Sequence, residues 1–261
     1  MAKLTANRPS ISFWFLPTFV SVALLLAVWL FAIGPGGLQS WILASPEASI
    51  GAVLAQPEYF FFHAGGTLTV IFWAVTLSLL VGVLLGAVSA VCRQLNTAIW
   101  AALVLAQALP IFALGPVVAV LIGASLLKSV VVASLILVFP VALSLHRGMK
   151  AIDRDLVDAG RLDAPNVAVL FTNVLWPLSL PSLMGGVRAA STIAPMAAFI
   201  GELAGTERGL SRIIAREMSM GRTDMVWGAV LIMIFMAFGL FAASAIVERL
   251  VVPWSFLEED K

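Results

Sequence analysis

The sequence predicts an all-α protein, a polytopic helical bundle with about six membrane-spanning helices. Two numbers predict it: 61% of the 261 residues are hydrophobic and only 11% are charged. A soluble domain of this length carries about 25% charged residues, so there is too little polar surface here to cover a soluble globule. Lipid must therefore be part of the solvent, and long uncharged runs mark where the chain crosses it.

The uncharged runs are each long enough, or nearly so, to cross about 30 Å of hydrocarbon as a helix. Lys3 and Arg8 precede the first run, as in a secretory signal, but a run of roughly 24 uncharged residues favours a retained helix. No internal repeat or separate soluble domain is evident, so 1–261 is predicted to be a single transmembrane domain. The predicted spans are about 11–34, 65–91, 97–123, 129–146, 182–203 and 225–247.

Glycine and proline refine these elements. Ser45 followed by Pro46 is typical of a helix start and predicts a short helix within 45–62. Pro110 and Pro116 are expected to kink or interrupt the third span. Gly82 and Gly86, four residues apart in the second span, suit close helix packing.

Lys and Arg predict the orientation. With the N-terminus in the cytoplasm, the inner segments carry ten of the 15 Lys and Arg residues, and both termini are cytoplasmic. Segment 204–224 is the exception, because it places four arginines outside. Its basic, amphipathic pattern suits contact with a partner protein, attraction of anions, or a helix on lipid headgroups. Arg188, near the start of the fifth span, is expected to reach the headgroups.

No residue pattern predicts catalysis or a resident cofactor. A net charge of +1 gives no reason to propose nucleic acid as a partner. The two histidines, His63 and His146, and the one cysteine, Cys92, do not make a metal-binding pattern. The chain has no Gly-x-x-x-x-Gly-Lys-Ser/Thr, so it does not hold ATP by the P-loop route.

The polar segment 147–181, between the fourth and fifth spans, reads as two short helices on the cytoplasmic side. Asp153 or Asp155 caps the first, and Pro165 ends it. The second runs to about Leu175, before Pro177 and Pro181. Charges pair between Arg154 and Asp158 and between Asp158 and Arg161. One apolar stripe follows helical spacing: Ile152, Leu156, Ala159 and Leu162.

This segment resembles the Glu-Ala-Ala loop of type I ABC importer permeases. An ungapped match places Asp158-Ala159-Gly160 on Glu-Ala-Ala, Ala164 on the glycine that follows, and 174–177 on the Ile-x-Leu-Pro ending. The spacing agrees throughout, although several identities differ. The resemblance covers about 45–254, and within the family the chain is most similar to the branch that handles nitrate, sulfonates and taurine. Its other motifs include Ser45-Pro46, Ala108-Leu109-Pro110, Phe139-Pro140, 181–188, Gly201-Glu202-Leu203 and Glu248-Arg249-Leu250.

The resemblance implies a permease subunit in the bacterial cytoplasmic (inner) membrane. Its partners would be cytoplasmic ATPase subunits that carry ATP and Mg²⁺, a second permease copy or paralogue, membrane lipid, and an extracytoplasmic substrate-binding protein. The substrate would be a small solute of the nitrate, sulfonate or taurine type, or a vitamin or pyrimidine precursor. By the match, the ATPase-coupling residues are Asp158, Ala159, Gly160, Arg161, Ala164 and Pro165.

Broken helices often border transport paths, so Pro110 and Pro116 are candidates for the translocation path, and a plain kink explains these prolines equally well. Glu202, at the outer end of the fifth span, is a third candidate for the path or its outer gate. A second reading of Glu202, which we favour, is that it pairs with an arginine of 204–224 or meets water, since an unpaired acid in lipid is costly. Two other protein classes remain open. A secondary transporter needs intramembrane ionisable groups and usually a repeat, and a membrane enzyme needs a catalytic cluster.

Overall fold

The computed structural model describes residues 20, 23–24, 26–123, 125–163, 166–203 and 206–257. These residues form helices joined by short turns, with no strand in the described part. Residues 26–33 are helical, and half of the span predicted at 11–34 lies outside the described residues. The helices are α2 (Pro46–Ala55), α3 (Pro57–Val91), α4 (Arg93–Ala108), α5 (Ile111–Ile122), α6 (Leu126–Lys150), α7 (Arg154–Asp163), α8 (Val167–Leu170), the π-helical turn η1 (Phe171–Leu175), α9 (Trp176–Glu202), α10 (Leu210–Ser219), α11 (Thr223–Val251) and α12 (Trp254–Leu257).

The membrane-spanning elements agree with the predicted all-α bundle. Within the described residues, α3, α6, the stretch Val167–Glu202 and α11 are each long and apolar enough to cross a membrane. Helices α4 and α5 together make a further candidate span, bent by 96° at Leu109–Pro110. Pro110 therefore interrupts the third span as predicted, whereas Pro116 lies inside α5 without ending it.

Two predicted boundaries are wrong. Helix α3 begins at Pro57 rather than at about residue 65, because proline at the first helical position favours the start of a helix there. Pro177 and Pro181 do not separate two helices, since the chain is helical from Val167 to Glu202. A π-helical turn lies directly before Pro177, which therefore falls in the first turn of α9, where a proline is tolerated.

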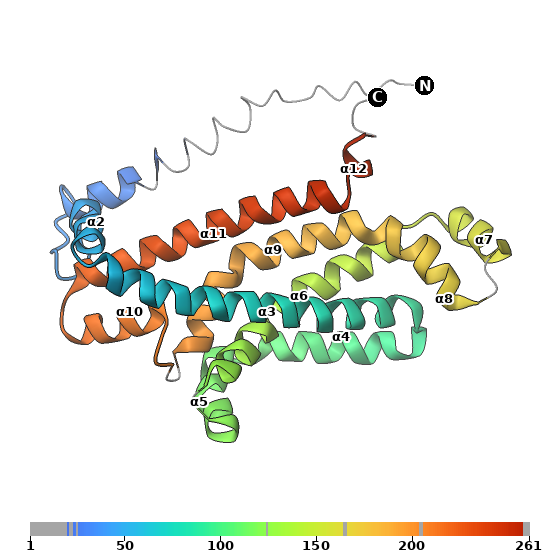
Figure 1. The fold of residues 1–261 in the computed structure, drawn as a ribbon, viewed down its shortest axis with the longest axis horizontal. Coiled ribbons are helices and arrows are strands. Elements are labelled where there is room, and N and C mark those ends of the chain that lie inside the picture. The colour runs from blue at the N-terminus through green and yellow to red at the C-terminus, as the bar shows by residue number, and fades with distance from the viewer. Residues whose placement is uncertain are drawn as a thin grey trace.

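Helix α6 lies at the centre of the bundle between α3 and α9 (Figure 1). Gly86 faces α6 so closely that an added Cβ would lie 2.7 Å from the Ala142 carbonyl oxygen. An added Cβ on Gly82 would lie 2.8 Å from a methyl of Val141, which confirms the close packing predicted for both glycines. The core between these helices is apolar and includes Val70, Ala74, Leu137, Leu145, Ala190 and Ala197.

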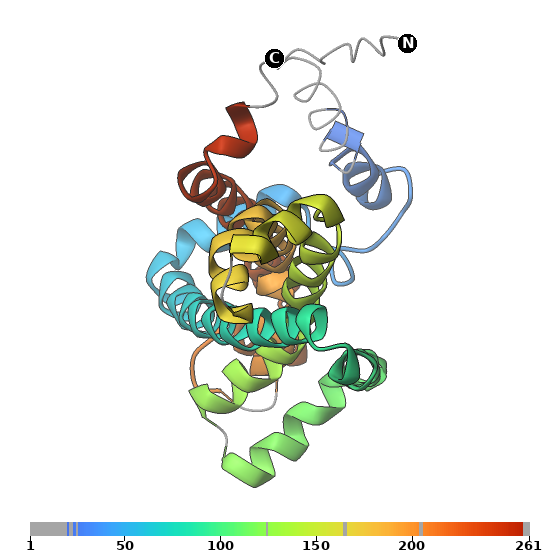
Figure 2. The ribbon, with the colours of Figure 1, turned by 90° about the vertical axis from the view of Figure 1, so that its right-hand side faces the viewer.

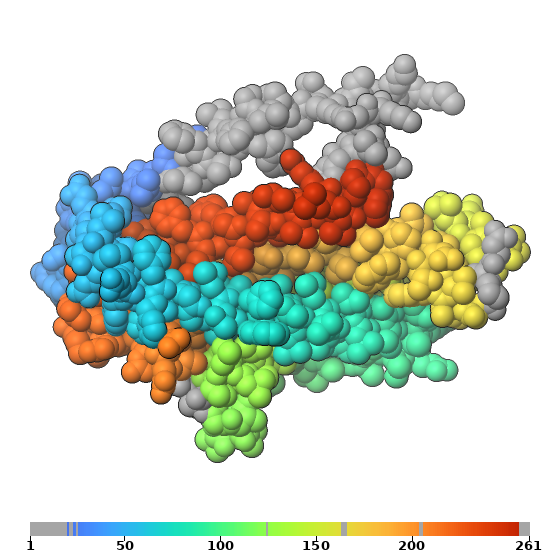
Figure 3. Space-filling model, viewed as in Figure 1, coloured from blue at the N-terminus to red at the C-terminus, as the bar shows by residue number. Residues whose placement is uncertain are grey.

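Two helices have largely exposed surfaces. Figure 3 shows α3 and α11 running along one face of the molecule. Large apolar side chains are exposed on both helices, among them Phe72 and Leu80 on α3 and Phe235 on α11, as expected for contact with lipid. Helix α5 projects away from the bundle (Figures 1 and 2), and Gly115 is its buried residue.

The short helices lie at opposite ends of the bundle. Helices α7 and α8 lie at one end, and α2 and α10 lie at the other (Figure 1). We call these the α7 end and the α10 end. The short helix predicted within 45–62 is α2, and the Ser45 hydroxyl caps it by accepting a hydrogen bond from the Ala48 amide at 3.1 Å.

Candidate functional site

Helix α7 is attached to the bundle through a glycine. Asp153 starts the helix, with its carboxylate accepting a hydrogen bond from the Asp155 amide at 3.0 Å, as predicted. A Cβ added to Gly160 would lie 2.9 Å from a methyl of Val174 and 3.1 Å from one of Leu170. Gly160 therefore lets α7 lie directly against α8 and η1, and a larger residue would push α7 away.

The predicted apolar stripe of α7 does not pack against the protein. Leu156 is 55% exposed and Leu162 is 88% exposed. Ala159 is also exposed, and the partly buried positions of the helix are Val157 and Gly160. The stripe therefore offers apolar surface at the α7 end, and such a surface usually marks a contact site for a partner.

The charged residues of α7 form one of the two expected pairs. Arg161 donates to the Asp158 carboxylate at 2.8 Å, with both side chains about two-thirds exposed. Within the described chain, Arg154 makes no ion pair with Asp158. Ala164 and Pro165 lie outside the described residues. The structure thus divides the residues matched to the Glu-Ala-Ala loop, with Gly160 turned toward the protein and Ala159 turned away from it.

Continuous helix connects this region to the α10 end. Helix α9 follows α8 and η1 without a break and packs along α6. Gly186 of α9 approaches α6 so closely that an added Cβ would lie 2.6 Å from the Ser144 Cβ. Leu170 and Val174, against which α7 packs, therefore lie on the same continuous helical stretch as Glu202, the last residue of α9.

At the α10 end, three consecutive backbone amides at the start of α10 are hydrogen-bonded by side chains from other helices. The Gly209 amide donates to His63 Nδ1 at 3.2 Å and the Leu210 amide to Thr67 Oγ1 at 2.9 Å. The Ser211 amide donates to the Glu202 carboxylate at 3.3 Å. The first amides of a helix have no partner within it, so these bonds fix α10 onto α3 and α9.

Glu202 is buried, which contradicts the reading that it pairs with a nearby arginine or meets water. It is 2% exposed, and none of the ion pairs among the described residues joins Glu202 to an arginine. The fully buried Lys128 interacts with it electrostatically. The reason is local: Gly201 lies directly against the Ser129 backbone, which brings the adjacent residues Lys128 and Glu202 to the same level of the bundle. Its place along the translocation path stays a prediction.

The sequence analysis missed the residues that accompany Glu202. His63 and Thr67 are buried on one face of α3, and their spacing of four was a signal that they act together. Lys128 is a cation within a membrane helix, and such residues are rare enough to be candidates for a role. Lys128 Nζ and one oxygen of Glu202 have no hydrogen-bond partner among the described residues.

The other end of α10 is fixed through Glu217. This residue is 1% exposed and forms an ion pair with Arg222. Tyr59 donates a hydrogen bond to it at 3.4 Å. The apolar side chains of α10, Leu210 and Ile213, are fully buried in a cluster with α2, α3 and α11. Its arginines therefore face outward while its apolar face packs within the protein.

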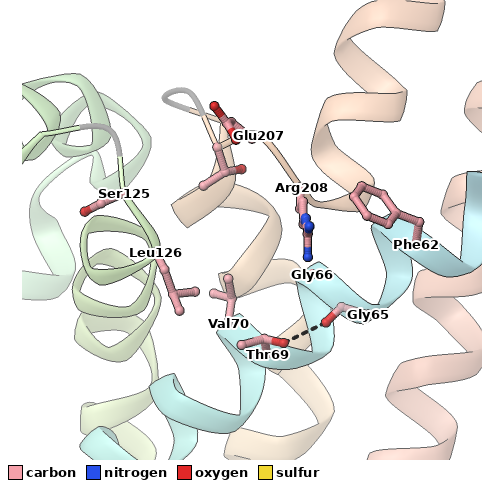
Figure 4. Close-up of a pocket in the computed structure, with 10 residues that line it drawn as sticks. Phe62, Gly65, Gly66, Thr69, Val70, Ser125, Leu126, Glu207 and Arg208 are labelled. Carbon is pink, nitrogen blue, oxygen red and sulfur yellow. Dashed lines mark hydrogen bonds between the residues drawn. The ribbon is translucent and has the colours of Figure 1, made fainter.

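A cavity of about 480 Å³ opens beside α10, between α3 and the start of α6 (Figure 4). The Arg208 guanidinium lies 4.4 Å from the centre of the Phe62 ring. Gly66 permits this approach, because an added Cβ there would lie 2.9 Å from the Arg208 Cβ. Glu207, Thr69 and Ser125 also line the cavity, so it combines a cation, a carboxylate, an aromatic ring and small polar residues.

The sequence predicted that Arg188 reaches the lipid headgroups, but in the structure Arg188 also contacts another helix. It forms an ion pair with Glu248 of α11, whose side chain is 14% exposed. Its guanidinium also lies 5.6 Å from the centre of the Phe241 ring. The pair joins α9 to α11, and its partner could not be found from the sequence because the two residues are 60 positions apart.

The histidines do not form a metal site in the described part of the chain. No group of three or more His, Cys, Asp or Glu side chains is arranged there to hold a metal ion. His63 caps α10, and His146 Nδ1 lies 2.8 Å from the Ser89 hydroxyl beside Trp100. Both histidines have a structural explanation in these contacts.

Comparison with known proteins identifies the kind of subunit. The chain is 27% identical to a probable ABC transporter permease protein of Haemophilus influenzae, over 84% of this chain and 90% of that one. It is 28% identical to the formylaminopyrimidine transport permease protein ThiX of Halalkalibacterium halodurans, over 83% and 87% of the two chains. It is 29% identical to the riboflavin transport system permease protein RibX of Chloroflexus aurantiacus, over 90% and 88%.

The family match explains the architecture described above. Residues 78–255, more than half of the chain, match the family described as binding-protein-dependent transport system inner membrane component. This assignment supersedes the secondary-transporter and membrane-enzyme alternatives, because the relatives are transport permeases. The chain therefore belongs to the binding-protein-dependent inner membrane components, the multi-pass permease subunits of type I ABC importers.

Proposed function

We propose that this permease pairs with a second copy or a paralogue to form the path of a small solute, and that α7 transmits ATP-driven movement from a cytoplasmic ATPase subunit. The observation that carries the proposal is the exposed apolar stripe of α7, with Leu162 88% exposed. The stripe lies on a helix seated against the base of α9, so force applied there acts directly on a membrane-spanning element. ATP and Mg²⁺ would be bound by the partner, since this chain has no P-loop.

The distribution of basic residues supports a cytoplasmic location for the α7 end. Lys150, Arg154 and Arg161 lie there, close to the ends of the spanning helices α3 and α6. An excess of Lys and Arg is typical of cytoplasmic segments. The N- and C-termini would then also be cytoplasmic, and α10 would face the outside.

The anchoring of α10 supports a role in binding an extracytoplasmic protein. A helix that rests on lipid headgroups turns its apolar face into the membrane. Leu210 and Ile213 instead pack inside the protein, leaving Arg212, Arg216 and Met218 exposed. Arginine and methionine are enriched at protein interfaces. Of the roles proposed for this segment, we therefore favour contact with an acidic surface of the substrate-binding protein.

For the substrate, we propose a vitamin or pyrimidine precursor rather than a sulfonate. The relatives named for formylaminopyrimidine and riboflavin transport are 28% and 29% identical to this chain. The Escherichia coli relatives named for aliphatic sulfonates and taurine are 25% and 23% identical. The pairing of Arg208 with Phe62 at the outer cavity suits a flat solute that carries hydrogen-bond acceptors.

Co-purification tests the coupling proposal. The full chain is extracted from native membranes in mild detergent, and retained proteins are identified by mass spectrometry. We expect a P-loop ATPase with the wild type and its loss from the double variant L156D/L162D. L54D is the matched control, because Leu54 is 73% exposed on α2 at the opposite end. Retention of the ATPase by the double variant would refute coupling through this stripe, and its absence even from crosslinked wild type would refute the ATPase partnership.

A further inference from the structure

A second feature of the α7 end is a cavity on the inner side of α7. It measures about 670 Å³ and lies between α7, the ends of α3 and α6, and the α8–η1 segment. Figure 2 faces this end of the molecule, where these segments come together. The exposed stripe assigned above to the ATPase does not line it, apart from the half-buried Ile152.

The cavity is lined by more cations than anions. Lys150, Arg154 and Arg161 contribute to its wall, and among the described residues that line it Asp158 is the one carboxylate. Asp158 is already paired with Arg161 at 2.8 Å. The side chains of Lys150 and Arg154 have no hydrogen bond or ion pair within the described chain. Two positive charges of the cavity are therefore left uncompensated.

The geometry of α7 separates these charges from the apolar stripe. Arg154, Asp158 and Arg161 are spaced by four and three residues, so they share one face of the helix. Leu156 and Ala159 are spaced by three residues and lie on another face. One helix thus presents an apolar surface outward and a charged surface toward the ends of the membrane helices.

The position of the cavity favours a ligand from the membrane surface. Its walls include Val91 at the end of α3, Lys150 at the end of α6, and Leu175 just before α9. These residues mark the ends of membrane-spanning helices, where lipid headgroups lie. Basic pockets between membrane helices on the cytoplasmic side suit anionic headgroups, while the apolar wall suits the first carbons of an acyl chain.

We propose that this cavity binds a phosphate-bearing anion, with an anionic phospholipid headgroup as its favoured source, through Lys150 and Arg154. The inference rests on the proposed function only in placing the α7 end on the cytoplasmic side. A headgroup held there lies between α7 and the ends of α3 and α6. Its occupancy would therefore bias the position of the helix that contacts the ATPase.

Lipid retention tests this site in the full-length chain. The protein is reconstituted in vesicles of phosphatidylcholine and phosphatidylglycerol, re-extracted in mild detergent, and its bound lipids are counted by native mass spectrometry. A basic side chain near an anionic surface contributes about fivefold in affinity, so K150Q/R154Q is expected to lose roughly 25-fold in preference for phosphatidylglycerol. The control R93Q/R147Q removes two cations from the same end that do not line the cavity.

Each outcome has a defined meaning. Selective loss in K150Q/R154Q, with the control unchanged, supports the lipid site. If excess inorganic phosphate displaces the lipid, or binds where lipid does not, free phosphate is the source and the lipid assignment is overturned. Equal loss in both double variants, or no preference in the wild type, overturns the cavity as a site. Thermal unfolding of each variant excludes misfolding, and lipid retention without any ATPase would leave this inference standing while the coupling proposal failed.

Discussion

The anchoring of α10 leads to a prediction whose magnitude follows from a single hydrogen bond. The Leu210 amide donates to Thr67 Oγ1 at 2.9 Å, and both residues are 0% exposed. Thr67→Val keeps the shape of the side chain but removes the acceptor. An unsatisfied buried amide costs about 1–3 kcal/mol, which corresponds to a roughly 5- to 150-fold increase in local opening.

Hydrogen–deuterium exchange measures this opening in the full chain. We expect faster exchange in the peptide that contains α10 for T67V, with α6 unchanged. T69V is the matched control, because the Thr69 hydroxyl donates to Gly65 O within α3 at 2.8 Å and is exposed. If α10 exchanges at the same rate in T67V as in the wild type or T69V, then the three side-chain caps do not hold this helix and the argument fails.

Three further predictions concern contacts between helices. Gly160→Val is expected to displace α7 and reduce ATPase co-purification. Gly51→Val, on the exposed face of α2 at the opposite end, where an added Cβ meets open space, is the control and is expected to be tolerated. Equal retention of the ATPase by both variants would contradict the packing of α7 described here. Gly82→Val is expected to lower stability in thermal unfolding by about 1–3 kcal/mol through overpacking against α6, while Gly65→Ala, which meets open space, should change it little. Glu248→Gln is expected to lower the free energy of unfolding by about 1 kcal/mol or less, because its partner Arg188 is 36% exposed and screened by solvent. A double-mutant cycle of Arg188 and Glu248 that shows no coupling would refute the ion pair.

Local signals predicted the fold well where one residue sets the outcome. Ser45 caps α2 through its hydroxyl, Pro110 breaks the third span, and Gly82 packs on α6 because it has no side chain. Hydropathy located the spans for the same reason, because lipid requires long apolar helices. Predicted boundaries failed at two prolines, because α3 starts at Pro57 and the helical stretch continues through Pro177.

The candidate site was less accessible to sequence reasoning. Glu202 was predicted to pair with an arginine of 204–224 or to meet water. In the structure it accepts a hydrogen bond from the Ser211 amide, and its electrostatic partner is the distant Lys128. Contacts between residues far apart in sequence depend on which helices meet, and the chain alone does not specify this. The apolar stripe of α7 was read correctly as a stripe, but only the structure shows that it faces away from the protein.

The unbroken helix α9 has a mechanical consequence. Its 27 residues span about 40 Å at the usual rise per residue. If it tilts as a stiff lever, a rotation of about 10° at its base would displace the far end by about 7 Å over this length. That far end is Glu202, which holds the start of α10. In the proposed coupling mechanism, a small movement at the α7 end would then produce a larger displacement at the α10 end.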